Sequence, residues 1–197
     1  MIKFVLTFCL TILFVQLYGQ IEATTTNDKK VLLFEDGTWK YVKTNRIHSI
    51  DCMQLTSIAE DTTTGGKYIS SSGNVFVSKN GKKGFRISIK KIFSEEYTGF
   101  YFKVIGGGCI GDNPMIEILF RDGSNSNFFA DSESNCENNV YVFLGGKYGK
   151  EEYLEQIREK EIKTMRIHTT DSYVQENFTV ENSRKLINIL ICILGKA

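Results

Sequence analysis

Three short segments, 100–104, 116–120 and 140–144, share an alternating pattern that limits the fold more than any other feature of the chain. The first, third and fifth residues of each segment are Phe, Val, Ile or Leu. Successive side chains of a β-strand point to opposite faces, so each segment would present one apolar face to a core. Clusters of Gly, Asn and Asp separate the segments, as expected between strands. The pattern predicts strands of one sheet system.

Further strands are expected on both sides of this block. A strand at 85–93 would open it, and strands at 162–169 and 173–178 would form a final hairpin around Thr170-Asp171. The segment 47–58 is also expected to be a strand.

Two segments in the last third of the chain follow the helical period. The first, 150–160, places Tyr153, Leu154 and Ile157 on one side. The second, 180–194, follows Thr179 as a capping residue. Its expected apolar stripe consists of Leu186, Ile187, Leu190, Ile191 and Leu194. The sequence therefore predicts a mainly β fold that is α+β at the C-terminus. It would be an antiparallel β-sandwich or a partly open barrel with two helices in the last third.

The N-terminus has the layout of an export signal. Lys3 precedes an apolar run at 4–17, and the small residue Gly19 follows. An uncleaved membrane anchor is the alternative, although the run is shorter than the roughly 20 residues of a membrane span. The expected division of the chain is a signal peptide at 1–19, a loose N-terminal segment at 20–28 and a single β-rich domain at 29–197. We therefore expect export to the periplasm, the cell envelope or the outside of the cell, with no transmembrane span after cleavage.

Four cysteines remain outside the leader: Cys52, Cys109, Cys136 and Cys192. An even number in an exported chain permits two disulfides, with three possible connectivities. We favour Cys109 with Cys136, which would join two loops of the central sheet, and Cys52 with Cys192, which would join the chain ends. Buried free thiols are the alternative. The spacing contains no C-x-x-C pair, which makes a zinc ribbon improbable.

A tight hairpin is expected near the start of the mature chain. The runs 30–34 and 38–42 flank Glu35-Asp36-Gly37, and Asp-Gly between β-prone runs is a strong hairpin signal. The stretch Lys-Val-Leu-Leu-Phe-Glu-Asp-Gly-Thr-Trp at 30–39 resembles a hairpin found after the leader in uncharacterised exported proteins of Bacteroidetes-type bacteria. The resemblance implies a bacterial envelope setting and no particular activity. We expect Trp39 to cover one end of the core, and a platform for a ligand is the alternative.

One acidic loop is a candidate metal site. Its alternating oxygen-bearing residues are Asp131, Glu133, Asn135 and Glu137. Calcium prefers such oxygen ligands, but the spacing departs from an EF-hand loop, and a solvated acidic loop is the alternative. The solvated loop is the favoured interpretation, and no cofactor is expected.

Other chemistry finds little support in the sequence. The glycines at 106–111 match G-x-G-x-x-G, but another strand is expected after them, whereas a dinucleotide site needs a helix there. His168 lies in an alternating strand and is expected to face solvent. Glu95 and Glu96 are adjacent, which indicates a solvated turn more than a glycosidase pair. A formal net charge of +1 offers no electrostatic basis for binding nucleic acid.

Two classes of function remain. The favoured one is an exported or cell-envelope binding protein without enzymatic activity, whose partner is a protein or a glycan. The alternative is a hydrolase whose site the sequence does not reveal. A flat exposed aromatic patch would favour the binding protein, and a cavity lined by converging polar groups would favour the enzyme.

Overall fold

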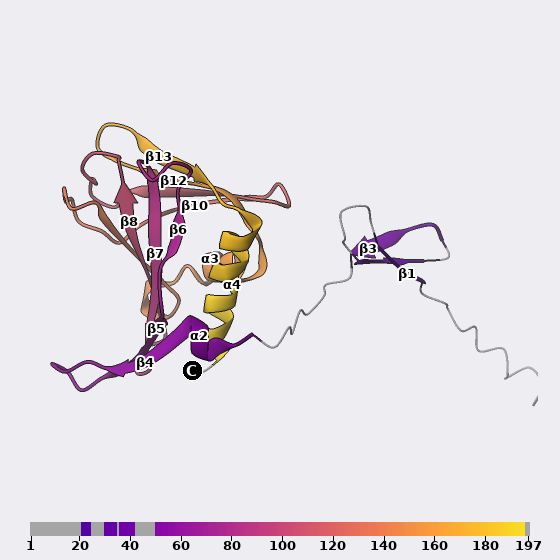
Figure 1. The fold of residues 1–197 in the computed structure, drawn as a ribbon, viewed down its shortest axis with the longest axis horizontal. Helices are drawn as coiled ribbons and strands as arrows, with labels where there is room; N and C mark the ends of the chain where they lie inside the picture. Colours follow the sequence, from indigo (N-terminus) through magenta and orange to yellow (C-terminus); the bar gives the residue numbers. More distant parts are fainter. Residues whose placement is uncertain (1–20, 25–29, 35, 42–49, 196–197) are drawn as a thin grey trace, which may run out of the picture. The chain divides into compact units, whose positions relative to one another are not determined.

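The computed structural model describes residues 21–24, 30–34, 36–41 and 50–195 (Figure 1). The chain divides into two compact units, Met1–His48 and Ser49–Ala197. The expected signal peptide at 1–19 lies outside the described residues.

The N-terminal unit contains a three-stranded antiparallel sheet. Its strands, in the order in which they pair, are β1 (Ile21–Thr24), β2 (Lys30–Leu33) and β3 (Trp39–Tyr41). The hairpin expected around Asp36-Gly37 is present, with Leu33 opposite Trp39. The Asp36 carboxylate stabilises its turn, because Oδ1 accepts hydrogen bonds from the backbone N–H and the hydroxyl of Thr38 at 2.8 and 2.6 Å.

Two expectations for this region differ from the structure. The segment 20–28 was expected to be loose, yet it contains β1, which pairs with the free edge of β2. A hairpin leaves one edge of each strand unpaired, so an adjacent β-prone run can join it. The expected single domain at 29–197 is also divided, because the hairpin belongs to the N-terminal unit. Trp39 is 56 % exposed within the described residues, and its role as a cover for one end of the core stays a prediction.

The C-terminal unit is mainly β, with two antiparallel sheets in a sandwich-like α+β arrangement. Its strands are β4 (Thr56–Glu60), β5 (Lys67–Ser71), β6 (Val75–Val77), β7 (Gly84–Ile92), β8 (Thr98–Ile105), β9 (Met115–Phe120), β10 (Asn125–Phe129), β11 (Asn139–Leu144), β12 (Ile162–His168) and β13 (Tyr173–Asn177). The six-stranded sheet has the order β11-β8-β7-β5-β4, with β6 also paired to β7. The four-stranded sheet has the order β10-β9-β12-β13. Its strands lie across the upper end of β7 and β8 in Figure 1.

The core lies between the two sheets and under the C-terminal helix. The inward residues of β7, β8, β9 and β11 are almost completely buried, as their alternation predicted. They include Phe85, Ile87, Ile89, Phe100, Phe102, Val104, Ile116, Ile118, Phe120, Val140, Val142 and Leu144. Consequently the intervening residues of these strands form the outer faces of both sheets.

The helices are α2 (Cys52–Leu55), the 3-10 turn η1 (Gly146–Tyr148), α3 (Glu151–Glu159) and α4 (Val180–Gly195). The two helices expected in the last third are thus present. The segment 47–58, expected to be one strand, instead contains α2 before β4 begins at Thr56. Asp51 explains this difference, because its Oδ1 accepts a hydrogen bond from the Met53 N–H at 3.1 Å and caps the short helix.

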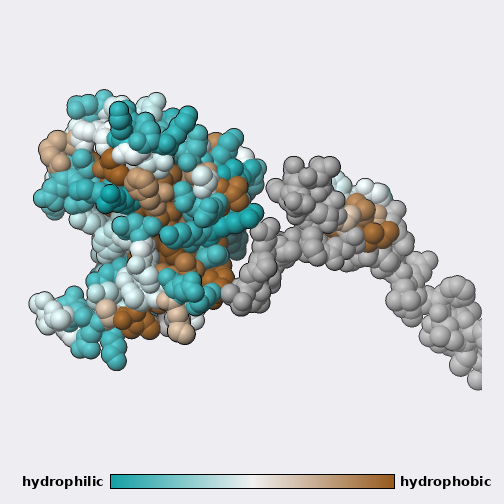
Figure 2. Space-filling view, in the orientation of Figure 1, coloured by the Kyte–Doolittle hydropathy of each residue, from teal (hydrophilic) through white to brown (hydrophobic). Residues whose placement is uncertain are grey.

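Helix α4 covers the core with a different stripe from the one expected. Thr179 caps the helix as predicted, since its Oγ1 accepts a hydrogen bond from the Asn182 N–H at 3.0 Å. The buried residues are Ser183, Leu186, Ile189, Leu190, Cys192 and Ile193. Ile191, placed in the expected stripe, is 41 % exposed. In the view of Figure 2, hydrophobic residues reach the surface beside this helix. No helix in the described part of the chain is long and apolar enough to cross a membrane.

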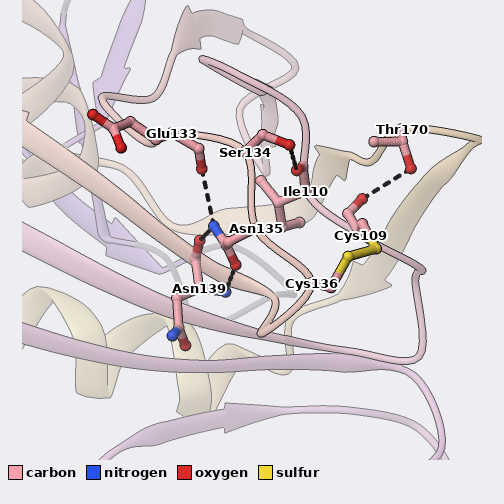
Figure 3. The surroundings of a disulfide bond; sticks show 8 residues. All are labelled: Cys109, Ile110, Glu133, Ser134, Asn135, Cys136, Asn139 and Thr170. Carbon is pink, nitrogen blue, oxygen red and sulfur yellow. Dashed lines mark hydrogen bonds between the residues drawn. A yellow bond between two sulfur atoms is a disulfide. The ribbon is translucent and has the colours of Figure 1, made fainter.

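Two disulfides join distant segments with the connectivity favoured from the sequence. Cys52 of α2 is bonded to Cys192 of α4, and Cys109 is bonded to Cys136. Beside the second bond, Ile110 and Asn135 exchange backbone hydrogen bonds of 2.7 and 3.0 Å, so the two loops lie side by side (Figure 3). Two disulfides indicate a protein that matures in an oxidising environment, extracellular or periplasmic.

Candidate functional site

The outer face of β8 and β11 has a continuous group of aromatic side chains. Tyr101 lies directly opposite Tyr141 in the strand register, and Phe143 lies opposite Gly99. Two further rings come from outside these strands, Tyr97 just before β8 and Tyr148 at the end of η1. We call these five residues, Tyr97, Tyr101, Tyr141, Phe143 and Tyr148, the aromatic strip.

The five rings contact one another in sequence across the surface. Tyr141 and Tyr101 have ring centroids 5.5 Å apart, and Tyr101 and Phe143 have centroids 6.4 Å apart. Phe143 then contacts Tyr97 at 5.3 Å and Tyr148 at 4.8 Å. Most of these pairs meet edge to face, which is a favoured geometry for aromatic rings. The strip is therefore an ordered surface, since each ring restrains its neighbours.

A glycine within β8 makes room for this arrangement. A Cβ atom at Gly99 would lie 3.0 Å from the ring and from the hydroxyl of Tyr101. The Tyr101 ring therefore lies over Gly99 and fills the place of the missing side chain. Aromatic rings that cover strand glycines stabilise sheets in this way.

Tyr101 and Tyr97 keep their protons at neutral pH. Burial raises the pKa of Tyr101 above its ordinary value of 10.0, and burial with the nearby Glu95 carboxylate does the same for Tyr97. Tyr141 is the most accessible of these rings, with 37 % of its surface exposed. Tyr101 and Tyr97 thus offer neutral rings with hydroxyl groups that can donate hydrogen bonds.

A shallow hollow of about 370 Å³ lies on the other sheet, and one of about 270 Å³ adjoins the strip. The hollow beside the strip is lined by Asn74, Arg86, Ser88, Tyr101, Phe102, Lys103, Asn139 and Tyr141. Arg86 and Lys103 bring positive charge to it, and the Arg86 guanidinium lies 5.8 Å from the exposed Phe76 ring. At the far end of the strip, the Lys147 ammonium lies 5.5 Å from the rings of both Tyr97 and Tyr148. Cations therefore border the aromatic centre at both ends.

Three of the four candidate calcium ligands, Asp131, Asn135 and Glu137, have other side-chain partners. Asp131 Oδ1 lies 2.9 Å from the Lys150 Nζ, and its Oδ2 accepts a hydrogen bond from the Phe143 N–H at 2.8 Å. The Asn135 side-chain amide donates to the carbonyl oxygens of Glu133 and Asn139, both at 3.0 Å.

Glu137 Oε2 accepts a hydrogen bond from the Asn139 side chain at 3.2 Å. Within the described residues, no three His, Cys, Asp or Glu side chains gather closely enough to hold a metal ion. The described residues therefore do not gather the candidate ligands into a metal site: Lys150 pairs with Asp131, and Asn135 and Glu137 form hydrogen bonds within the loop.

The other residues considered from the sequence are also placed. His168 is half-buried on the outer face of β12, less exposed than expected, with Nε2 3.6 Å from Glu117 Oε2. The other histidine of the chain, His48, lies outside the described residues. Glu95 lies 3.8 Å from Lys147 in an ion pair. The glycine loop at 106–111 leads into β9 and not into a helix, as expected for a connection between strands.

Comparison with protein-family models, with curated proteins and with solved structures gives no match to this chain.

The sequence alone did not predict the aromatic strip. Its alternation places Tyr101, Tyr141 and Phe143 on outer faces, but it does not show which strands are neighbours. The pairing of β8 with β11, which are separated by β9 and β10 in the chain, brings the rings together. One signal could have indicated the strip: Tyr and Phe recur at the outward positions of two separate strands.

Proposed function

We propose that this chain is an exported binding protein without enzymatic activity that holds a partner protein on its aromatic strip. Export is supported by the leader-like N-terminus and by the two disulfides, which suit the periplasm, the cell envelope or the outside of the cell.

The observation behind this proposal is the composition of the strip from centre to edge. Protein interfaces typically have an aromatic centre and a polar, charged rim, and Tyr and Arg are common among the residues that dominate binding. Tyr101, Tyr141 and Phe143 supply such a centre, while Arg86 and Lys103 supply the rim. Because the rings already restrain one another, binding loses little side-chain freedom.

The charges around the strip favour an acidic partner. Arg86 and Lys103 lie at one end and Lys147 at the other, while Glu95 offsets part of the charge of Lys147. A partner with carboxylates placed around an apolar contact would match this pattern, and the charged rim would mainly increase the rate of association.

The alternative, a hydrolase, finds less support at this surface. The residues that line the hollow beside the strip contain neither a carboxylate nor a histidine that could transfer a proton. The four described cysteines form disulfides and therefore offer no thiolate nucleophile. A binding surface needs none of these groups.

Site-specific photo-crosslinking in cells that export the protein tests the proposal. Tyr141 is replaced by p-benzoylphenylalanine, which keeps an aromatic ring at the most accessible place in the strip. Phe129 on β10, which is 61 % exposed and belongs to the other sheet, receives the same replacement as a matched control.

Illumination is expected to give a covalent adduct with a defined protein from position 141 and not from position 129. Mass spectrometry then identifies that protein, and its purified form should bind Tyr141→Ala roughly tenfold or more weakly than the parent, the loss typical of one important interface residue. The absence of an adduct at 141, or the same adducts at both positions, would contradict the proposal.

A further inference from the structure

The second sheet has a polar outer face whose side chains lie in register across all four strands. Asn127 of β10 is opposite Glu117 of β9, Glu117 is opposite Arg166 of β12, and Arg166 is opposite Gln175 of β13. We call these four residues the polar row. They line the hollow of about 370 Å³, together with Leu119, Asn125 and Thr164. This volume is within the range of about 300–1,000 Å³ for small-molecule sites.

The centre of the polar row is held in one geometry before any ligand arrives. Arg166 donates from Nη1 to Glu117 Oε2 at 2.8 Å, and from Nε and Nη2 to Gln175 Oε1 at 3.0 and 2.7 Å. Its guanidinium also lies 4.3 Å from the centre of the Tyr173 ring. A side chain fixed in this way presents its remaining N–H groups in a defined direction, which reduces the cost of binding.

Several polar groups in the hollow remain available for a ligand. Among the residues that the structure describes, the side-chain amides of Asn125 and Asn127 have no hydrogen-bond partner, and neither has Oε1 of Glu117. Each amide can both donate and accept, whereas the carboxylate oxygen only accepts. Asn127 and Glu117 are direct cross-strand neighbours, whose Cβ atoms are about 5 Å apart in an antiparallel sheet. Their side chains can thus reach two adjacent groups of one small ligand.

The charge of the hollow and its apolar surface limit which class of ligand it can bind. The charges of Glu117 and Arg166 balance each other, so the hollow has no strong attraction for an ion. Leu119, which is 37 % exposed, lies in the neighbouring row between Asn125 and Thr164. A ligand that is a neutral ring, with hydroxyl groups at its edge and C–H groups on its face, would match these features. Its hydroxyl groups suit the hydrogen-bond donors and acceptors of the hollow, and its C–H face suits the apolar surface of Leu119.

We propose that the polar row is a binding site for a neutral sugar ring. Asn125, Asn127 and Glu117 Oε1 would hydrogen-bond its hydroxyl groups, and Leu119 would contact its C–H face. Glu117 is the one carboxylate among the residues that line the hollow, whereas most glycosidases use two. The site therefore binds sugar without cleaving it. It lies on a different sheet from the aromatic strip and does not depend on the function proposed for that strip.

NMR titration of the full-length, disulfide-bonded, ¹⁵N-labelled protein tests this site. The probes are methyl α-glucopyranoside, methyl α-mannopyranoside and methyl β-galactopyranoside, which differ in the orientation of their hydroxyl groups. Glycerol serves as the control for unspecific polyol effects. The readouts are the side-chain amide signals of Asn125 and Asn127, assigned by their loss in single alanine variants, and the Nε–H signal of Arg166.

At least one glycoside is expected to shift these signals to saturation, while glycerol is not. The double variant Asn125→Ala with Asn127→Ala should bind that glycoside roughly tenfold or more weakly, which corresponds to at least about 1.4 kcal/mol. Tyr141→Ala, on the other sheet, should bind it unchanged. The backbone spectrum shows whether each variant is folded. The proposal is overturned if no glycoside gives a saturable shift, if glycerol gives the same shift, or if the folded double variant binds as well as the parent.

Discussion

Truncation of Leu190 in α4 tests the packing of the C-terminal unit most directly. Leu190 has no exposed surface, and the helix lies against β5, β6, β7 and β12. Leu190→Ala removes three carbon groups from this contact. At about 0.8 kcal/mol for each buried group, the lost hydrophobic transfer alone costs about 2.4 kcal/mol. The cavity left behind raises the expected total to about 2–5 kcal/mol, depending on how far the walls relax.

Ile191→Ala is the matched control. The two residues are neighbours on the same helix and have the same number of carbon atoms, but Ile191 is 41 % exposed. Alanine also favours the helix over isoleucine by a few tenths of a kcal/mol, which offsets part of the lost contact. We therefore expect this variant to lose less than about 1 kcal/mol.

Urea unfolding of the disulfide-bonded protein measures both changes. With a slope of about 2 kcal/mol per M urea, Leu190→Ala should lower the midpoint by about 1–2.5 M and Ile191→Ala by less than about 0.5 M. Circular dichroism before unfolding confirms that each variant starts from the folded state. If Leu190→Ala lowers the midpoint no more than Ile191→Ala does, α4 does not cover the core with the stripe described above.

Three further predictions concern the helix, a disulfide and the strip. Ser183→Ala should lower the free energy of unfolding by about 1–3 kcal/mol, because the Ser183 hydroxyl accepts a hydrogen bond from the buried Ile162 N–H at 2.7 Å and alanine leaves that donor unpaired. A loss no greater than that of an alanine substitution at an exposed α4 residue would refute this role. Replacing Cys52 and Cys192 together by alanine should lower stability by up to about 5 kcal/mol, since their bond closes a loop of 140 residues, and an unchanged unfolding midpoint would contradict it. Burial raises the pKa of Tyr101 in the folded state. The neutral Tyr101 side chain therefore contributes stability that is fully present below the unfolded-state pKa of about 10 and is lost as the pH rises through the folded-state pKa. Tyr101→Phe should flatten the fall in the free energy of unfolding at alkaline pH, and an equally steep fall would count against this prediction.

Local signals in the sequence were enough for most strands, because alternation and turn chemistry act over a few residues. One strand shows how such a signal can be missed. Asp122-Gly123 has the same Asp-Gly pattern as the first hairpin, and β10 follows it. Asp122 Oδ1 accepts hydrogen bonds from the backbone N–H and the hydroxyl of Ser124 at 2.9 and 2.6 Å, and the bond from the hydroxyl is the main cause that lowers the pKa of Asp122. Because the first three residues of β10 are polar, no apolar alternation indicated a strand there, and Asn125 and Asn127 were not recognised as strand residues.

Helix α4 shows what a local pattern leaves undecided. Nearly every residue from 186 to 194 is apolar, so the period identifies a helix but not the side that faces the core. The disulfide from Cys192 to α2 and the contacts with β12 select the buried side, which leaves Ile191 at the surface. The helical period of the sequence thus predicts that α4 is a helix. Packing against distant segments determines which side of the helix faces the core.

The sequence by itself determined the β-rich class, the first hairpin, the two C-terminal helices and the four cysteines available for pairing, because these depend on side-chain period, turn residues and composition. Tertiary structure alone decided which strands far apart in the chain became neighbours. Strand order placed Tyr101 beside Tyr141 and aligned Asn127, Glu117 and Arg166 across three strands. A binding surface depends on such cross-strand contacts between segments far apart in the chain, and no periodicity within a single segment specifies them.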